Sequence, residues 1–179
     1  MNQSGVTLVE LMVVLAVFAI LLGIGIPSFV GLANSSRLTS ATNELVSSLH
    51  LARSEAIKRN SRTVMCTSAT GTSCAASGGW QQGWLVFHDN NNNAVLDAGE
   101  MVILARQAQP AGLLLTGNMP VSKYISYSPS GATKLISGAF QAGTLTLCNV
   151  SGVPGMARQV VISSTGRPRT SKITLASCP

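Results

Sequence analysis

The chain begins with a long apolar segment that carries a single carboxylate. From Leu11 to Ile26 there is no charged or strongly polar side chain, and the run continues to Phe29 and Val30. A helix needs about 20 such residues to cross a bilayer. Glu10 lies at the start of this segment, where a carboxylate costs about 2.5–3.5 kcal/mol to insert, so a functional role with a partner is expected. We therefore predict one spanning helix, followed by a domain outside the cytoplasm.

The helical pattern continues well beyond the apolar segment. Leu38, Leu45, Leu49 and other apolar residues recur at three- and four-residue spacing, which gives an amphipathic face. Basic residues crowd the last turns and Asn60 is a suitable C-cap. We predict one helix over about residues 6–60, in which Pro27 and the 31–36 stretch are the places for a break.

Short strand-like runs follow the helix, bounded by Gly, Pro, Asn or Ser. The chain has 179 residues, and the roughly 145 outside the apolar start suit one globular domain. The predicted fold is α+β, with the N-terminal helix packed across an antiparallel sheet. Residues 69–79 and 109–117 are predicted loops, and Trp80, in a Gly-rich stretch, is the aromatic residue expected to be exposed. The predicted strands are 62–67, 84–88, 101–107, 124–128, 144–148, 159–163 and 172–175.

The start of the chain resembles the prepilin signature, in which a short leader ends in glycine and an acidic residue follows closely. The resemblance implies that prepilin peptidase cleaves after Gly5, that the new amino group of Val6 is methylated, and that Glu10 neutralises the amino terminus of a neighbouring subunit. Pro27 matches the position of a helix-bending proline in pilins. The implied organisation is a leader (1–5), a transmembrane and assembly helix (6–30) and a periplasmic or extracellular pilin domain (31–179). The leader lacks the usual basic residue, and a plain membrane anchor is the alternative.

Several later motifs, in order, resemble the GspH/FimT group of minor pilins and pseudopilins. The motifs are spread over nearly the whole chain. Each is weak evidence for the family by itself, and their order makes the combination specific. The resemblance implies that the protein enters the inner membrane as a single-pass prepilin and then joins a pilus with other major and minor pilins. The matching segments are 51–60, 83–89, 97–100, 128–131 and 164–167.

The charges divide unevenly along the chain. The net charge is +6, and no acidic residue lies beyond Glu100, whereas seven basic residues do. Such a C-terminal part attracts polyanions such as nucleic acid, anionic lipid headgroups or an acidic protein. A basic surface that serves only solubility fits the composition equally well.

The segment Gly166-Arg167-Pro168-Arg169 is the sharpest candidate for a binding site. Gly166 permits a tight turn, and planar guanidiniums suit phosphate oxygens. Arg158 and Lys172 lie close in the predicted hairpin, so the cluster could hold a DNA backbone without reading its sequence. In FimT-type pilins of naturally transformable bacteria, a Gly-Arg-x-Arg motif is associated with DNA binding, which this chain matches at Gly166, Arg167 and Arg169.

The resemblance thus implies a minor type IV pilin that binds extracellular double-stranded DNA for natural transformation. The alternative is a structural minor pilin or type II secretion pseudopilin whose arginines contact acidic patches on neighbouring pilins. Adhesion to surfaces or anionic glycans through the same patch is a third reading.

The four cysteines suggest disulfides in an exported domain. No CxxC pair occurs, which argues against zinc. Of the three pairings that four cysteines allow, we favour Cys66–Cys74 and Cys148–Cys178.

The Asn-rich segment after residue 88 has its oxygen ligands spaced as in an EF-hand loop. Ala94 stands where that loop needs glycine, and a strand precedes it in place of a helix. A hairpin loop built on Asx turns is the favoured reading, so no metal or other cofactor is expected. The ligand positions for calcium would be Asp89, Asn91, Asn93, Asp97 and Glu100.

The sequence gives no sign of catalysis. His50 and His88 are the only histidines. No serine lies in a nucleophile-elbow context, and no phosphate- or dinucleotide-binding loop occurs. We do not expect an enzyme.

Overall fold

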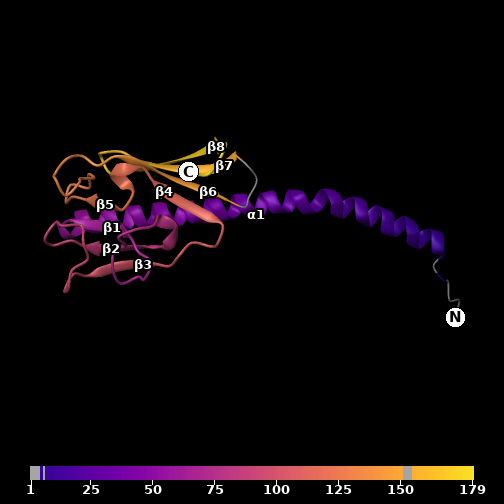
Figure 1. Ribbon diagram of the computed structural model, residues 1–179, viewed down its shortest axis with the longest axis horizontal. Helices are drawn as coiled ribbons and strands as arrows, with labels where there is room; N and C mark the ends of the chain where they lie inside the picture. Colours follow the sequence, from indigo (N-terminus) through magenta and orange to yellow (C-terminus); the bar gives the residue numbers. More distant parts are fainter. Residues whose placement is uncertain (1–4, 6, 151–154) are drawn as a thin grey trace.

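The computed structural model describes Gly5, residues 7–150 and residues 155–179, with the backbone alone for 24–28. Its dominant element is α1 (Leu8–Arg59), one continuous, gently curved helix that passes through Pro27 without a break (Figure 1). Thr7 caps its start, and Asn60 ends it in a left-handed conformation (φ 50°). The predicted helix of about residues 6–60 is therefore confirmed within the described residues.

The first half of α1 projects from the domain, whereas the second half packs within it (Figure 1). Leu8, Leu11 and Phe18 are each more than half exposed, whereas Leu38, Leu45 and Leu49 are buried. Among the residues whose side chains the structure describes, no helix is long and apolar enough to cross a membrane.

Two antiparallel sheets, each of four strands, pack against the second half of α1. The strand order is β3-β2-β1-β5 in one sheet, called sheet A, and β4-β6-β7-β8 in the other, called sheet B. Two short 3-10 helices, η1 (Trp80–Gln82) and η2 (Met119–Val121), complete the domain. The strands are β1 (Thr63–Thr67), β2 (Trp84–His88), β3 (Val102–Arg106), β4 (Leu113–Gly117), β5 (Tyr124–Tyr127), β6 (Gly143–Asn149), β7 (Gly155–Ile162) and β8 (Pro168–Leu175).

One hydrophobic core joins α1 to the inner faces of both sheets. Leu45 and Leu49 of α1 contribute to it with Val86 of sheet A and Leu145 and Val160 of sheet B. The α+β class with a long helix on antiparallel sheet structure is confirmed, although the strands divide into two sheets where one was predicted.

Two local predictions were wrong. Residues 113–117 form β4, which pairs with β6, because the Leu113 and Leu115 side chains face the core. Trp80 is fully buried, and its indole N–H donates to the Val121 carbonyl at 2.9 Å. A Gly-rich context permitted a close approach of chain segments here, and tertiary packing then buried the ring.

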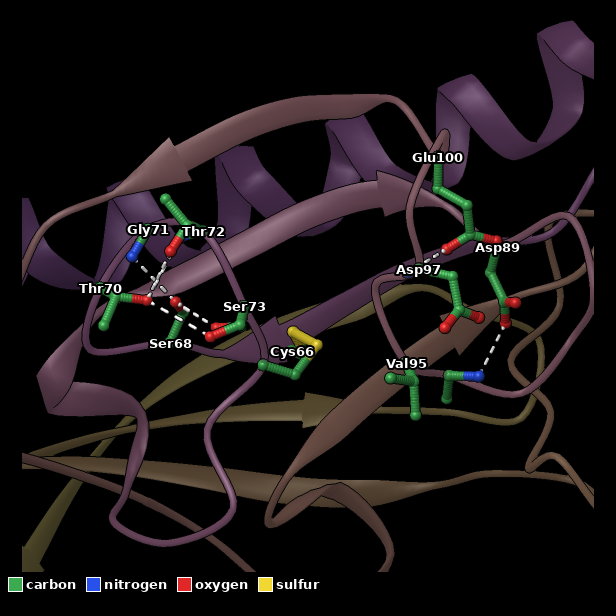
Figure 2. The surroundings of a disulfide bond; sticks show 12 residues. Cys66, Ser68, Thr70, Gly71, Thr72, Ser73, Asp89, Val95, Asp97 and Glu100 are labelled. Atoms are coloured by element: carbon green, nitrogen blue, oxygen red, sulfur yellow. Dashed lines mark hydrogen bonds between the residues drawn. A yellow bond between two sulfur atoms is a disulfide. The ribbon is translucent and has the colours of Figure 1, made fainter.

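A second, smaller apolar cluster lies on the outer face of sheet A. Val64 and Cys66 of β1 and Leu85 and Phe87 of β2 form it, and Ala94 and Leu96 of the Asn-rich loop pack on them. The loop that ends at Cys74 reaches the same face. Figure 2 shows this disulfide region beside the Asn-rich loop. Both faces of β1 are therefore covered, which explains why all its residues are buried.

The structure joins Cys66 to Cys74 and Cys148 to Cys178, the pairing favoured from the sequence. The Cα atoms of the two pairs lie 5.6 and 5.8 Å apart, within the usual range for disulfides. The second bond ties the end of the chain to β6.

Candidate functional site

The segment 163–167 forms the tight turn between β7 and β8. Gly166 has φ 77° and its N–H donates to the Ser163 carbonyl at 2.8 Å. This left-handed backbone favours glycine, as the sequence predicted. Arg167 follows directly and is exposed, and Arg169 is exposed near the start of β8. We call residues 163–169 the arginine turn.

The arginine turn is seated on a second turn, residues 128–131. Gly166 lies against the Gly131 carbonyl oxygen and beside the Tyr127 ring. Thr133, just beyond this second turn, donates its N–H to Ser164 at 3.2 Å and its hydroxyl to Ser163 at 3.0 Å. The two glycine turns that resembled family landmarks thus pack on each other.

This contact places the arginine turn at the end of the domain farthest from the N-terminus (Figure 1). Gly131 packs on Arg53 and Ile57, in the last two turns of α1. The projecting half of α1 and the arginine turn therefore occupy opposite ends of the molecule.

The structure does not bring all five predicted DNA-binding residues together. Arg169 lies opposite Val161 and Lys172 lies opposite Arg158 in the β7–β8 pairing. Because side chains alternate along a strand, Arg169 and Lys172 point to opposite faces of sheet B. Arg158 donates to the Thr39 hydroxyl at 3.0 Å. Arg158 and Lys172 thus line a groove of about 300 Å³ between α1 and β8, apart from the arginine turn.

The charge of the arginine turn is not neutralised within the described part of the chain. Carboxylates pair with other bases: Glu55 lies 3.0 Å from Arg59 and 3.7 Å from Lys58, and Glu44 lies 3.3 Å from Arg106. Within the described residues, no hydrogen bond or ion pair holds the side chain of Arg167 or Arg169. Sheet B has no acidic residue at all. The exposed guanidiniums are free to bind an anion.

Arg53 also lies beside the arginine turn. From the sequence it was only one of the basic residues expected near the end of the helix. Its Nε is enclosed and has no hydrogen-bond partner in the described residues. Burial raises the pKa of Tyr127 well above its usual range, and the nearby positive charge of Arg53 partly opposes this shift. Sequence spacing could not reveal the contact, because Arg53 and Tyr127 lie 74 residues apart in the chain.

His88 belongs to a buried cluster at the same end of the domain. Its Nδ1 lies 3.3 Å from the Thr63 hydroxyl, and its Nε2 lies 3.6 Å from the Glu55 carboxylate. Burial lowers the pKa of His88, and the hydrogen bond from Arg59 lowers the pKa of Glu55. Thr63 and His88 are enclosed, so this cluster holds the helix end on sheet A and offers no access to a substrate.

The Asn-rich loop is closed by its own hydrogen bonds. The buried Asp89 carboxylate accepts the N–H groups of Asn93 and Ala94, each at 3.0 Å. Glu100 accepts the N–H groups of Asn90 and Asp97. The Asn91 and Asn93 side chains donate to Asp97, which lowers the pKa of Asp97. The oxygens predicted as calcium ligands therefore serve Asx-type turns.

The loop is also fixed on the domain, because Ala94 and Leu96 pack on the outer face of sheet A. Within the described ranges, no three His, Cys, Asp or Glu side chains converge to hold a metal ion.

Glu10 and Thr7 form a capping box at the start of α1. The Thr7 hydroxyl accepts the Glu10 N–H at 3.2 Å, and Glu10 accepts the Thr7 N–H at 3.4 Å. Glu10 is exposed. Gly5 precedes the helix, and the predicted methylation position, Val6, lies outside the described residues.

A helix that projects from an α+β domain built on two antiparallel sheets defines the class of pilin-like proteins. The structure is similar to the type IV minor pilin FimU of Pseudomonas aeruginosa, with a TM-score of 0.58 and 19% identity over 79% of this chain and 96% of that one. It is also similar to the minor pseudopilin EpsH from the Type 2 Secretion System of Vibrio cholerae, with a TM-score of 0.52 and 12% identity over 76% and 97% of the two chains.

The sequence narrows this class to one family. Residues 41–166 match the family model of the Type II transport protein GspH, and residues 1–26 match the prokaryotic N-terminal methylation motif. The chain is 32% identical to the pilin-like protein PilA1 of Thermus thermophilus over 94% of this chain and 99% of that protein. The chain belongs to the GspH family.

Proposed function

We propose that this protein is a minor pilin of the FimT type that captures double-stranded DNA. Prepilin peptidase cleaves after Gly5, Val6 becomes the methylated amino terminus, and Glu10 pairs with a neighbouring subunit. Residues 6–30 hold the chain in the inner membrane and then enter the pilus, with residues 31–179 outside. The methylation motif over residues 1–26 and the exposed apolar side chains of the projecting helix support this assignment.

One observation carries the DNA assignment: the arginine turn is unpaired and lies at the end of the domain opposite the assembly helix. Arg167 and Arg169 are exposed in an acid-free sheet, and no carboxylate of the described residues pairs with them. A guanidinium donates in a planar fork that suits phosphate oxygens. Phosphate contacts of this kind position a duplex without specifying its sequence.

The test is a DNA titration of the full-length protein in a non-ionic detergent at several salt concentrations. The control for Arg167→Ala/Arg169→Ala is Arg37→Ala/Lys123→Ala, which removes the same charge away from the turn. We expect the first double variant to bind more weakly and to lower the salt slope by about two units. The control variant should keep most of the affinity and most of the salt slope of the wild type. Equal, weak binding by the wild type and both variants would refute the DNA assignment.

The alternative is a structural minor pilin or type II secretion pseudopilin without DNA binding. The match to the GspH family model and the contact of Arg158 with Thr39 favour it, because that arginine serves internal packing. In this case the variants of the arginine turn would bind DNA as the wild type does, yet lower incorporation into fibres. Adhesion would instead show as loss of binding to an anionic glycan.

A further inference from the structure

Arg53 differs from the other cations of the last turns of α1. Lys58 and Arg59 are held by Glu55. The Arg53 side chain makes no hydrogen bond or ion pair within the described part of the chain, and its Nε is enclosed without a partner. The enclosed Nε faces Gly131, whereas the two terminal nitrogens of the guanidinium are not enclosed, so they are the donors that a ligand can reach.

Two glycines, Gly131 and Gly166, connect Arg53 to the arginine turn through close contacts. A Cβ on Gly131 would lie 3.0 Å from Arg53 Nε and 2.8 Å from Ile57 Cδ1. On its other side, the Gly131 carbonyl touches Gly166, and Arg167 is the next residue. The backbone of Gly131 therefore lies between the Arg53 side chain and Gly166 of the arginine turn.

The packing also restrains the Arg53 side chain. Gly131 lies against its Nε, which is enclosed, and the residue as a whole is half-buried. A long side chain that is already restrained loses less conformational entropy when it binds. The rest of its planar fork can then meet a phosphate oxygen with little reorganisation.

We propose that Arg53 is a further DNA-binding residue, which holds the phosphate backbone from α1 while Arg167 holds it from the β7–β8 turn. This inference rests on the proposed DNA binding and extends it from one hairpin to a surface formed by two elements. It also gives the close packing of the two glycine turns a role, because that packing sets the distance between the two guanidiniums.

The test compares Arg53→Gln with Arg37→Gln in the full-length protein. Both variants lose one positive charge from the same helix, and the two positions lie about 24 Å apart along it. We expect Arg53→Gln to weaken the binding of a short duplex about tenfold and to lower the salt slope by about one unit. Arg53→Lys keeps the charge but loses the planar fork, so its affinity is intermediate. Arg37→Gln changes affinity less than about twofold.

If Arg53→Gln binds like Arg37→Gln while Arg167→Ala still loses affinity, the role of Arg53 is refuted and the proposed function stands. If none of the variants changes DNA binding, the proposed function itself fails. Thermal unfolding checks that Arg53→Gln remains folded. Modification of arginines in the wild type with phenylglyoxal needs no variant and so does not depend on a variant's folding. Bound DNA should protect Arg53 and Arg167 from modification but not Arg37. If DNA leaves Arg53 unprotected, the inference is overturned.

Discussion

Gly166 lies against the carbonyl oxygen of Gly131 so closely that a side chain at position 166 would collide with the second turn. The 128–131 turn thus lies between the end of α1 and the arginine turn, and it contacts both. The position of Arg167 relative to the helix depends on this contact between two backbones.

Gly166→Ala should destabilise the protein by at least about 2 kcal/mol, because it combines a left-handed backbone with a steric clash. Gly138→Ala is the matched control, since Gly138 also has a positive φ (86°) but no atom within 4 Å of a new Cβ. We expect about 1 kcal/mol of destabilisation there. Denaturant unfolding measures both. Equal losses would show that the contact between the two turns adds nothing to stability.

Asp89→Asn should destabilise the Asn-rich loop by about 2–3 kcal/mol. The buried carboxylate accepts two backbone N–H groups, and an amide can accept only one of them well. Asp97→Asn, at an exposed position with side-chain partners only, should have a much smaller effect. Denaturant unfolding with and without calcium tests whether the predicted ligand positions bind the ion. We expect calcium to leave the unfolding free energy unchanged. An increase in the unfolding free energy with calcium that Asp89→Asn removes would support calcium binding by this loop.

Stability should fall as the pH drops below about 6.5, the ordinary pKa of histidine. Burial lowers the pKa of His88 in the folded state, so the unfolded chain binds a proton in a pH range where the native state does not. This contribution is complete above the unfolded pKa and is lost as the pH falls toward the folded one. Glu55, whose pKa is also lowered, adds a further loss at lower pH, below about 4.5.

His88→Gln should flatten the dependence of the unfolding free energy on pH below about 6.5, the ordinary pKa of histidine. His50→Gln serves as its control because His50 is exposed on α1. Unfolding midpoints measured across this range check the prediction. An unchanged slope in His88→Gln would mean that another group is responsible.

The two disulfides should differ in their effect on stability. They close loops of 30 and 8 residues, for which chain entropy predicts about 3.6 and 2.5 kcal/mol respectively. Cys148→Ala/Cys178→Ala should therefore lose more stability than Cys66→Ala/Cys74→Ala by about 1 kcal/mol. Cys66 and Cys148 are both buried, so the truncation itself costs a similar amount. The reverse order would point to the cover of sheet A, where Cys66 packs, as the larger effect.

Local patterns predicted most of the elements, and long-range packing accounts for what they missed. The helix period and the cap at Asn60 are local, and so they located α1 to within two residues at each described end. The strand β4 is short and follows Pro110 and Gly112, which are typical of a loop, and only its pairing with β6 makes it a strand. The division into two sheets likewise depends on pairings that no local pattern contains.

The same limit applies to the candidate site. The turn at Gly166 follows from its residue types. The separation of Lys172 from Arg169 follows from strand alternation once β8 is known to start at Pro168, four residues before the predicted start at 172. The contact of Arg53 with Gly131, in contrast, joins α1 to a turn that lies beyond five strands, and only the assembled fold reveals it.

Glu10→Gln isolates the charge of Glu10 from its role as a helix cap. In the capping box with Thr7, glutamine can accept the same N–H that glutamate accepts, so α1 should begin where it does now. Glu10→Ala removes both the cap and the charge. If the charge neutralises the amino terminus of a neighbouring subunit, both variants should enter the membrane normally, yet each should reach pili at least severalfold less than the wild type. Immunoblots of sheared fibres and of the membrane fraction measure this ratio. Normal incorporation of Glu10→Gln together with a defect in Glu10→Ala would assign the effect to the cap, and the role of the charge in assembly would have to be given up.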